Sequence, residues 1–277
     1  MENSTFDPPT NQVWQALKRE CILVRGLLGS GIAALGKATS NYLEGYYLAF
    51  FNLSTGVERL SKLVLIVNSK IMNNEFPSGK VMKGYNHNIN GLLEEVYRIA
   101  ELHDLQLLYP NEKNIISDAI ISSLNHFADA QKGRYANIHA LEKNNSNTGF
   151  EPIRWWSEKV DRLILDYHWK NTSKSKKLNN IATRIADQLN DSWFVISTNE
   201  SGNTMNLEDI FQRFGSNKVL FKYRVYYTLV IIRSVSEIFN KLSQKNYLNE
   251  FSGLYEFFQG FCLNDPERLK YKKRPAF

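Results

Sequence analysis

The sequence predicts an all-α fold, and three observations support that prediction. Apolar side chains recur every three or four residues through most of the chain, which is the period of one face of a helix. No alternating run of apolar and polar residues is long enough for a useful strand, although residues 193–197 favour β structure. The 277 residues include only 7 prolines and 15 glycines, which suits long helices.

The longest periodic stretch covers residues 41–103 and predicts two helices. The first ends near residues 73–79, where asparagine, proline and glycine favour a turn. The second covers about residues 89–99. The apolar positions that define the two faces are Tyr42, Tyr46, Ala49, Leu53, Val57, Leu60, Val64, Val67 and Ile71, then Ile89, Leu92, Leu93, Val96 and Ile99. Two such helices need further helices to cover their apolar faces.

Helices are also predicted on both sides of this central pair. One begins near Thr10, and the glycines between residues 26 and 36 predict either close helix packing or a kink within it. Another covers residues 111–130 and is broken near Gly133. Residues 142–149 (EKNNSNTG) are polar and lack an apolar period, so they predict a linker.

The apolar period returns after the linker. A loop is expected at residues 199–203, and Gly215 is expected to stop a short helix. The predicted helical segments are residues 153–167, 178–193, 207–214, 220–242 and 248–261. We therefore expect a helical bundle over residues 10–145 and a C-terminal helical region over residues 150–277, either as separate units or as one compact unit.

The charges of the chain are unevenly distributed. The net charge is +6, yet basic and acidic residues balance over residues 1–140, so the excess lies after residue 140. Residues 268–277 carry basic side chains and no acid, and such a tail is either a solvated terminus or a phosphate-binding segment. Cys21 and Cys262 are too few for a disulfide framework or a zinc site. No signal peptide or membrane-length apolar run is seen, so we expect a cytoplasmic protein without membrane contacts.

Three short segments resemble the HEPN family of helical domains. Residues 56–63 (GVERLSKL), 76–77 (FP) and 85–92 (YNHNINGL) are similar to a GxExLLK helix, an FP turn and a GHDLxxL segment. Asn86 and Asn88 stand where that pattern has glycine and aspartate. The resemblance covers about residues 40–140 and implies a HEPN-like bundle with additional C-terminal helices. Many HEPN domains are ribonucleases of prokaryotic toxin and antiphage systems, whereas others are non-catalytic scaffolds.

The resemblance implies a catalytic motif of arginine and histidine separated by four to six residues. The histidine would transfer a proton at the ribose 2′-OH or the leaving oxygen, and the arginine would stabilise charge on the phosphate. Two protomers would form one composite, metal-independent site. The spacing occurs at Arg98–His103, Arg134–His139 and Arg162–His168.

Arg134 and His139 are the favoured pair. The other two pairs lie inside strong helical stripes, where five or six residues turn the two side chains roughly 120–140° apart. Arg134 follows Gly133, and residues 127–138 (FADAQKGRYANI) resemble an FA…RYxNLD segment that often follows GHDL in HEPN-like proteins. A catalytic role and a structural or interface role both stay open for this pair.

Other polar residues are weaker candidates. Glu58, His87 and Asn137 are candidate supporting residues of the site. Glu58 has a simpler interpretation as a solvated or salt-bridged side chain, and His87 as a helix cap or a buried hydrogen-bonding group. Around Trp169 lie candidate RNA-binding lysines that would act by charge and by stacking of bases on the aromatic ring, or else form a solvated loop. They are Lys170, Lys174, Lys176 and Lys177.

The leading functional hypothesis is a metal-independent endoribonuclease of a prokaryotic antiphage or toxin system, active as a HEPN homodimer on RNA. The alternative is a non-catalytic HEPN scaffold that binds RNA or a protein partner from the same defence system. No cofactor and no metal site are expected, because no spacing of acids, histidines and cysteines typical of metal ligands is recognised.

Overall fold

The computed structural model describes residues 11–109, 114–129, 151–189, 197–245 and 249–270. Within these ranges the fold is all-α, as predicted, with one minor antiparallel sheet formed by β1 (Ser197–Thr198) and β2 (Thr204–Met205). The helices are α1 (Gln12–Leu35), α2 (Glu44–Asn73), α3 (Gly79–Gly84), α4 (Ile89–Leu102), α5 (Ile115–Ala128), α6 (Pro152–Trp156), the π-helical turn η2 (Ser157–Asp161), α7 (Arg162–His168), α8 (Ser173–Leu189), α9 (Leu207–Lys245), the 3-10 turn η3 (Asn249–Phe251), α10 (Glu256–Gln259) and α11 (Asp265–Lys270).

Two glycines allow α1 and α2 to pack closely as an antiparallel pair. A Cβ atom at Gly31 would lie 2.7 Å from the side chain of Leu53, and one at Gly56 would lie 2.7 Å from that of Leu28. Helix α1 continues through its glycines to Leu35. Close packing, rather than a break in the helix, therefore accounts for Gly31.

The predicted apolar face of α2 faces the core. Tyr46, Leu53, Leu60 and Val67 are among its buried side chains. The helix starts at Glu44, three residues later than predicted, so Tyr42 precedes it. It ends where Asn74 takes a left-handed conformation as the C-cap.

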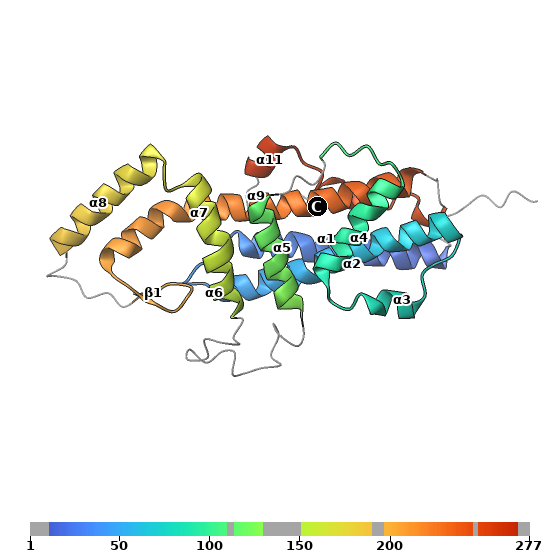
Figure 1. Cartoon of the computed structure of the whole chain (residues 1–277), viewed down its shortest axis with the longest axis horizontal. Coiled ribbons are helices and arrows are strands. Elements are labelled where there is room, and N and C mark those ends of the chain that lie inside the picture. Colours follow the sequence, from blue (N-terminus) through green and yellow to red (C-terminus); the bar gives the residue numbers. More distant parts are fainter. Residues whose placement is uncertain (1–10, 110–113, 130–150, 190–196, 246–248, 271–277) are drawn as a thin grey trace, which may run out of the picture.

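Helix α9 is the longest element, with 39 residues, and it runs along the bundle beside α1 and α2 (Figure 1). It also contacts α4 and α5, and one hydrophobic core includes side chains from the bundle and from the C-terminal region. The predicted helix stop at Gly215 is wrong, because α9 continues through this residue. None of the described helices has an apolar stretch suited to crossing a bilayer.

A buried ionic network joins α2, η2 and α9. Arg224 donates from Nε and Nη2 to the two carboxylate oxygens of Asp161, at 2.7 and 2.6 Å. It also donates to the backbone oxygen of Ala38 at 2.9 Å and to the hydroxyl of Tyr46 at 2.7 Å. The indole of Trp156 donates to Asp161 at 3.0 Å. These side chains are buried, so the network fixes how α9 lies against the α1–α2 pair.

Candidate functional site

The turn before α4 brings His87 to α2. Helix α3 ends at Gly84, and Asn86 takes a left-handed conformation with φ of 45°, which asparagine tolerates better than most residues. Asn88 is the N-cap of α4, since its side-chain oxygen accepts a hydrogen bond from the backbone N–H of Gly91 at 3.0 Å. His87 therefore does not cap the helix and is available for a different contact.

Glu58, Lys62 and His87 form a charged group that we call the Glu58 cluster. Glu58 is only 9% exposed. Its Oε2 atom lies 3.0 Å from Nδ1 of His87, and its Oε1 atom accepts a hydrogen bond from Nζ of Lys62 at 2.7 Å. Lys62 also donates to the backbone oxygen of Asn86 at 3.3 Å. The cluster therefore ties the middle of α2 to the turn before α4.

The electrostatics of the cluster favour an ionised carboxylate. Burial acts to raise the pKa of Glu58, but hydrogen bonds from Lys62 and His87 outweigh it, so this pKa lies below the usual value of a glutamate. A carboxylate bound at Nδ1 holds the imidazole proton there and leaves Nε2 as the basic nitrogen. The side chain of His87 is 49% exposed, and its Nε2 makes no hydrogen bond to the part of the chain that the structure describes. An oriented, accessible imidazole of this kind can exchange protons with a ligand.

The lowered pKa of Glu58 predicts a pH dependence of stability. A carboxylate whose pKa is lower in the folded state stabilises the fold above its unfolded pKa of about 4.3, and this contribution is lost as pH falls through the folded pKa. The urea midpoint is therefore expected to fall more between about pH 5 and pH 3 in the parent than in Glu58→Gln. Glu94→Gln, at an exposed position, is the control and should behave like the parent. Equal losses in the parent and Glu58→Gln would contradict the prediction.

The structure does not describe the proposed catalytic pair. Arg134, His139 and the supporting residue Asn137 lie outside the described residues, so their roles stay predictions. Of the predicted supporting residues, Glu58 and His87 are brought into direct contact. Lys62 was missed, although a lysine four residues after Glu58 on one helix is a recognised signal for an ion pair.

In the rival pair Arg98–His103, the two side chains have separate local partners. Arg98 forms a bidentate ion pair with Glu95, while His103 hydrogen-bonds through Nε2 to the side-chain oxygen of Asn68 at 2.7 Å.

His168, from the third pair, packs among tyrosines of α9. Its ring stacks on that of Tyr223 with centroids 3.6 Å apart, and its Nε2 atom lies 2.8 Å from the hydroxyl of Tyr227. Burial and then the charge of Lys222 lower the pKa of His168. These contacts give His168 a packing role at the junction of α7 and α9.

The predicted lysines divide between a pocket and an exposed helix. Lys170 forms an ion pair with Asp166 and lines a polar pocket of about 640 Å³ between α7, α8 and α9. The others are exposed on α8: Lys174, Lys176 and Lys177. Trp169 is buried, and its ring lies against the backbone of α9 at Gly215. The predicted stacking of bases on this ring is therefore wrong. Any contact of these lysines with RNA would depend on their charge alone.

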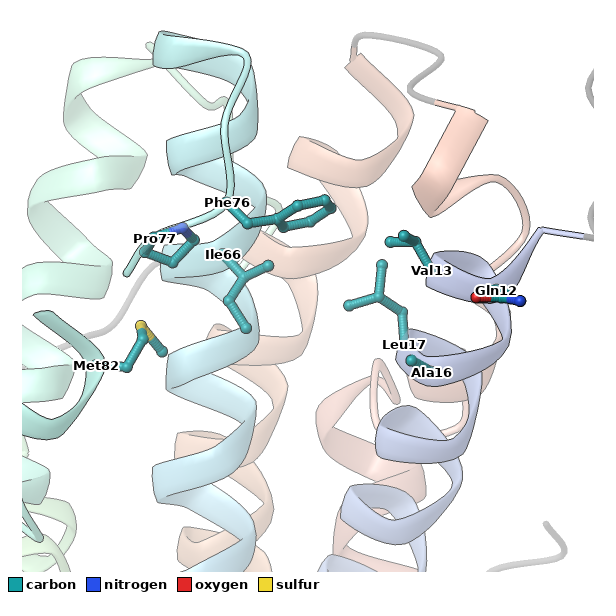
Figure 2. Close-up of a pocket in the computed structure, with 8 residues that line it drawn as sticks. All are labelled: Gln12, Val13, Ala16, Leu17, Ile66, Phe76, Pro77 and Met82. Carbon is teal, nitrogen blue, oxygen red and sulfur yellow. The ribbon is translucent and has the colours of Figure 1, made fainter. Parts of the chain in front are cut away.

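The FP turn of the family resemblance forms one wall of an apolar groove. Figure 2 shows Phe76 and Pro77 across from Val13 and Leu17 of α1, with Ile66 of α2 between them. The groove has a volume of about 340 Å³. The ring of Phe76 also packs on that of Phe251 at a centroid distance of 6.4 Å, so this turn links the end of α2 to η3.

Neither metal ligands nor a known relative adds a further assignment to the site. Within the described ranges, no three histidine, cysteine or acidic side chains are grouped so as to hold a metal ion. No family model, no curated protein and no solved structure matches the chain. The HEPN family is therefore a resemblance carried by the sequence motifs alone.

Proposed function

We propose that this chain is a HEPN-like endoribonuclease that cleaves RNA without a metal ion and acts as a homodimer in a prokaryotic antiphage or toxin system. The observation that supports the proposal most is the Glu58–His87 contact. It joins two motif segments that are 29 residues apart in the sequence, within an all-α fold. Both segments belong to the pattern that resembles the HEPN family.

The proposed reaction is an internal transesterification, in which the phosphoryl group of the RNA chain passes from the 5′-oxygen to the neighbouring 2′-oxygen. His139 takes the proton of a ribose 2′-OH, the 2′-oxygen attacks the adjacent phosphorus, and the bond to the 5′-oxygen breaks as a protonated His139 of the composite site gives that oxygen a proton. Arg134 stabilises the charge that develops on the phosphate oxygens. The products are a 2′,3′-cyclic phosphate and a 5′-hydroxyl, and a second protomer completes the site.

Two other groups have supporting roles in this proposal. The Glu58 cluster holds α2 and the turn before α4 together and presents the imidazole of His87. The exposed lysines of α8 attract the RNA backbone by charge, which makes binding salt-dependent.

Removal of either catalytic side chain is expected to reduce RNA cleavage by about 100-fold or more, because general acid–base terms alone contribute about 10²–10⁴. The assay follows a labelled RNA with Arg134→Ala and His139→Ala, after circular dichroism confirms helicity. Cleavage should persist in EDTA, and DNA should be left intact because it lacks the 2′-OH. His103→Ala is the control and should retain the parent rate.

The outcomes separate the two functional hypotheses. Cleavage that is unchanged without His139 would show that this residue is not the proton-transfer group. If the folded parent protein cuts no RNA under any condition, yet binds a protein partner or RNA, the enzyme hypothesis is wrong and the non-catalytic scaffold is favoured.

A further inference from the structure

A small cavity lies between α5, α9, α11 and the segment after α4. Its volume is about 140 Å³, well below the roughly 300–1,000 Å³ of sites for drug-sized ligands. Polar and aromatic side chains dominate its lining, and they include Tyr109, Ser117, Tyr226, Arg233, Asp265 and Arg268. None of its lining residues belongs to the Glu58 cluster.

Two arginines of this cavity are buried and incompletely bonded. Arg233 is 6% exposed and Arg268 is 1% exposed. The Nε atom of Arg233 and the Nε and Nη1 atoms of Arg268 have no hydrogen-bond partner within the described chain. The buried hydroxyl of Ser117 also lacks one. Buried donors are rarely left unpaired in native proteins, so this concentration of them indicates a missing acceptor.

The described residues supply little negative charge to these two cations. Asp265 is the acid that lines the cavity, and it pairs with both arginines, at 3.3 Å from Nη1 of Arg233 and also with Nη2 of Arg268. Its side chain is exposed, which weakens its attraction for a buried charge. Two guanidinium groups therefore share one solvated carboxylate.

A second acid nearby is already occupied. Glu237, one turn further along α9, accepts the backbone N–H groups of Leu108 and Tyr109 at 2.6 and 3.2 Å. It also lies 3.6 Å from the ammonium of Lys241. Its charge thus holds the segment after α4 and offsets Lys241. Among the described residues, the surplus charge at the cavity is therefore positive.

Aromatic rings hold the two guanidinium groups in place. The Cζ atom of Arg233 lies 3.7 Å from the ring centroid of Tyr109, and that of Arg268 lies 5.3 Å from the centroid of Tyr226. Burial, followed by the charge of Arg233, lowers the pKa of Arg268 to about 10, so it is still a cation at neutral pH. Rings that contact the face of a guanidinium leave its in-plane N–H groups free for an anion.

We propose that this cavity binds one tetrahedral oxyanion, namely inorganic phosphate or the phosphate group of a small monoester. Arg233 and Arg268 donate charge-assisted hydrogen bonds to its oxygens, and Ser117 supplies a further donor. The anion provides the acceptors that the buried donors lack and offsets the surplus positive charge. None of these residues has a role in the proposed cleavage reaction, so the two proposals are independent.

The test measures binding of inorganic phosphate to the full chain by titration calorimetry, and its melting temperature in phosphate against chloride at equal ionic strength. The parent protein is expected to give a saturable isotherm and a melting temperature that rises with phosphate. Arg268→Met replaces a buried cation by an apolar chain of similar length and should weaken the affinity at least tenfold. Arg154→Met, at an exposed arginine paired with Glu158, is the control and should bind like the parent.

Two results would overturn the proposal. One is a parent protein that melts at the same temperature in phosphate and in chloride. The other is a folded Arg268→Met variant that binds phosphate as tightly as the parent. If that variant does not fold, Ser117→Ala takes its place, because removal of an unbonded hydroxyl should preserve the fold, and unchanged phosphate affinity in it would then overturn the assignment.

A parallel titration with glycerol 3-phosphate distinguishes the two sources of the anion. Tighter binding of the monoester than of inorganic phosphate identifies an esterified ligand whose remaining part lies outside the cavity. Tighter binding of inorganic phosphate identifies the free ion. Either order supports the site, whereas saturable binding of neither compound contradicts it.

Discussion

Replacement of Asp161 by alanine is expected to lower the free energy of unfolding by about 3–5 kcal/mol, the usual cost of breaking a buried ion pair by removing one partner. Arg224 is buried and donates two hydrogen bonds to this carboxylate. Without Asp161 it becomes an unpaired cation in the interior, and the indole N–H of Trp156 also loses its acceptor. The measurement is a urea denaturation curve followed by circular dichroism.

The control for this variant is Asp166→Ala. Asp166 pairs with Lys170 on the surface, and such exposed pairs contribute only about 0–1 kcal/mol. The double variant Asp161→Leu with Arg224→Met removes both charges and should recover much of the loss, because an apolar replacement of a buried pair is often close to neutral. A midpoint for Asp161→Ala equal to that of Asp166→Ala would show that the network contributes little.

Leu60→Ala is expected to cost about 2–5 kcal/mol, through lost burial and the cavity left behind. Leu60 is 0% exposed and lies on the core face of α2, as its place in the apolar period predicted. Leu48→Ala is a matched control on the same helix, since Leu48 is 50% exposed and its truncation should change stability by less than about 0.5 kcal/mol. Equal urea midpoints for the two variants would contradict the assigned core face.

The apolar period was enough to predict which face of a helix is buried, where that face packs on the core. The buried face of α2 follows the predicted positions because burial of apolar side chains every three or four residues fixes how the helix lies. The start of α2 was less predictable. Tyr42 continues the apolar period into the turn before the helix, although its side chain is exposed.

Gly215 shows why a local signal can mislead. Glycine in a helix costs roughly 1 kcal/mol relative to alanine, so a stop was a reasonable prediction. In the structure a Cβ atom at this position would lie 3.0 Å from the side chain of Leu178 and 3.3 Å from the ring of Trp169. Glycine is therefore used for close packing against α7 and α8, and the same contact buries Trp169, which the sequence presented as a stacking surface.

The candidate sites were predictable only in part, because their partners are distant in the sequence. Glu58 and His87 were recognised from motifs, but their contact depends on the left-handed turn at Asn86, which no apolar period reveals. Asp161 and Arg224 are 63 residues apart and belong to no local pattern. The cavity lined by Arg233 and Arg268 likewise combines residues from three helices and a loop, whose proximity follows from packing.

The position of α9 in the chain has a consequence for synthesis. Its buried side chains Leu229, Val235 and Phe239 belong to the same core as α1 and α2, yet they are translated after all of the first five helices. At 5–20 residues per second, on the order of 10 s pass between completion of α5 and completion of α9. During that interval the nascent chain exposes the apolar faces that α9 later covers. Ribosome-associated chaperones are therefore expected to bind it. Premature termination before α9 would yield an aggregation-prone polypeptide, not a smaller folded protein.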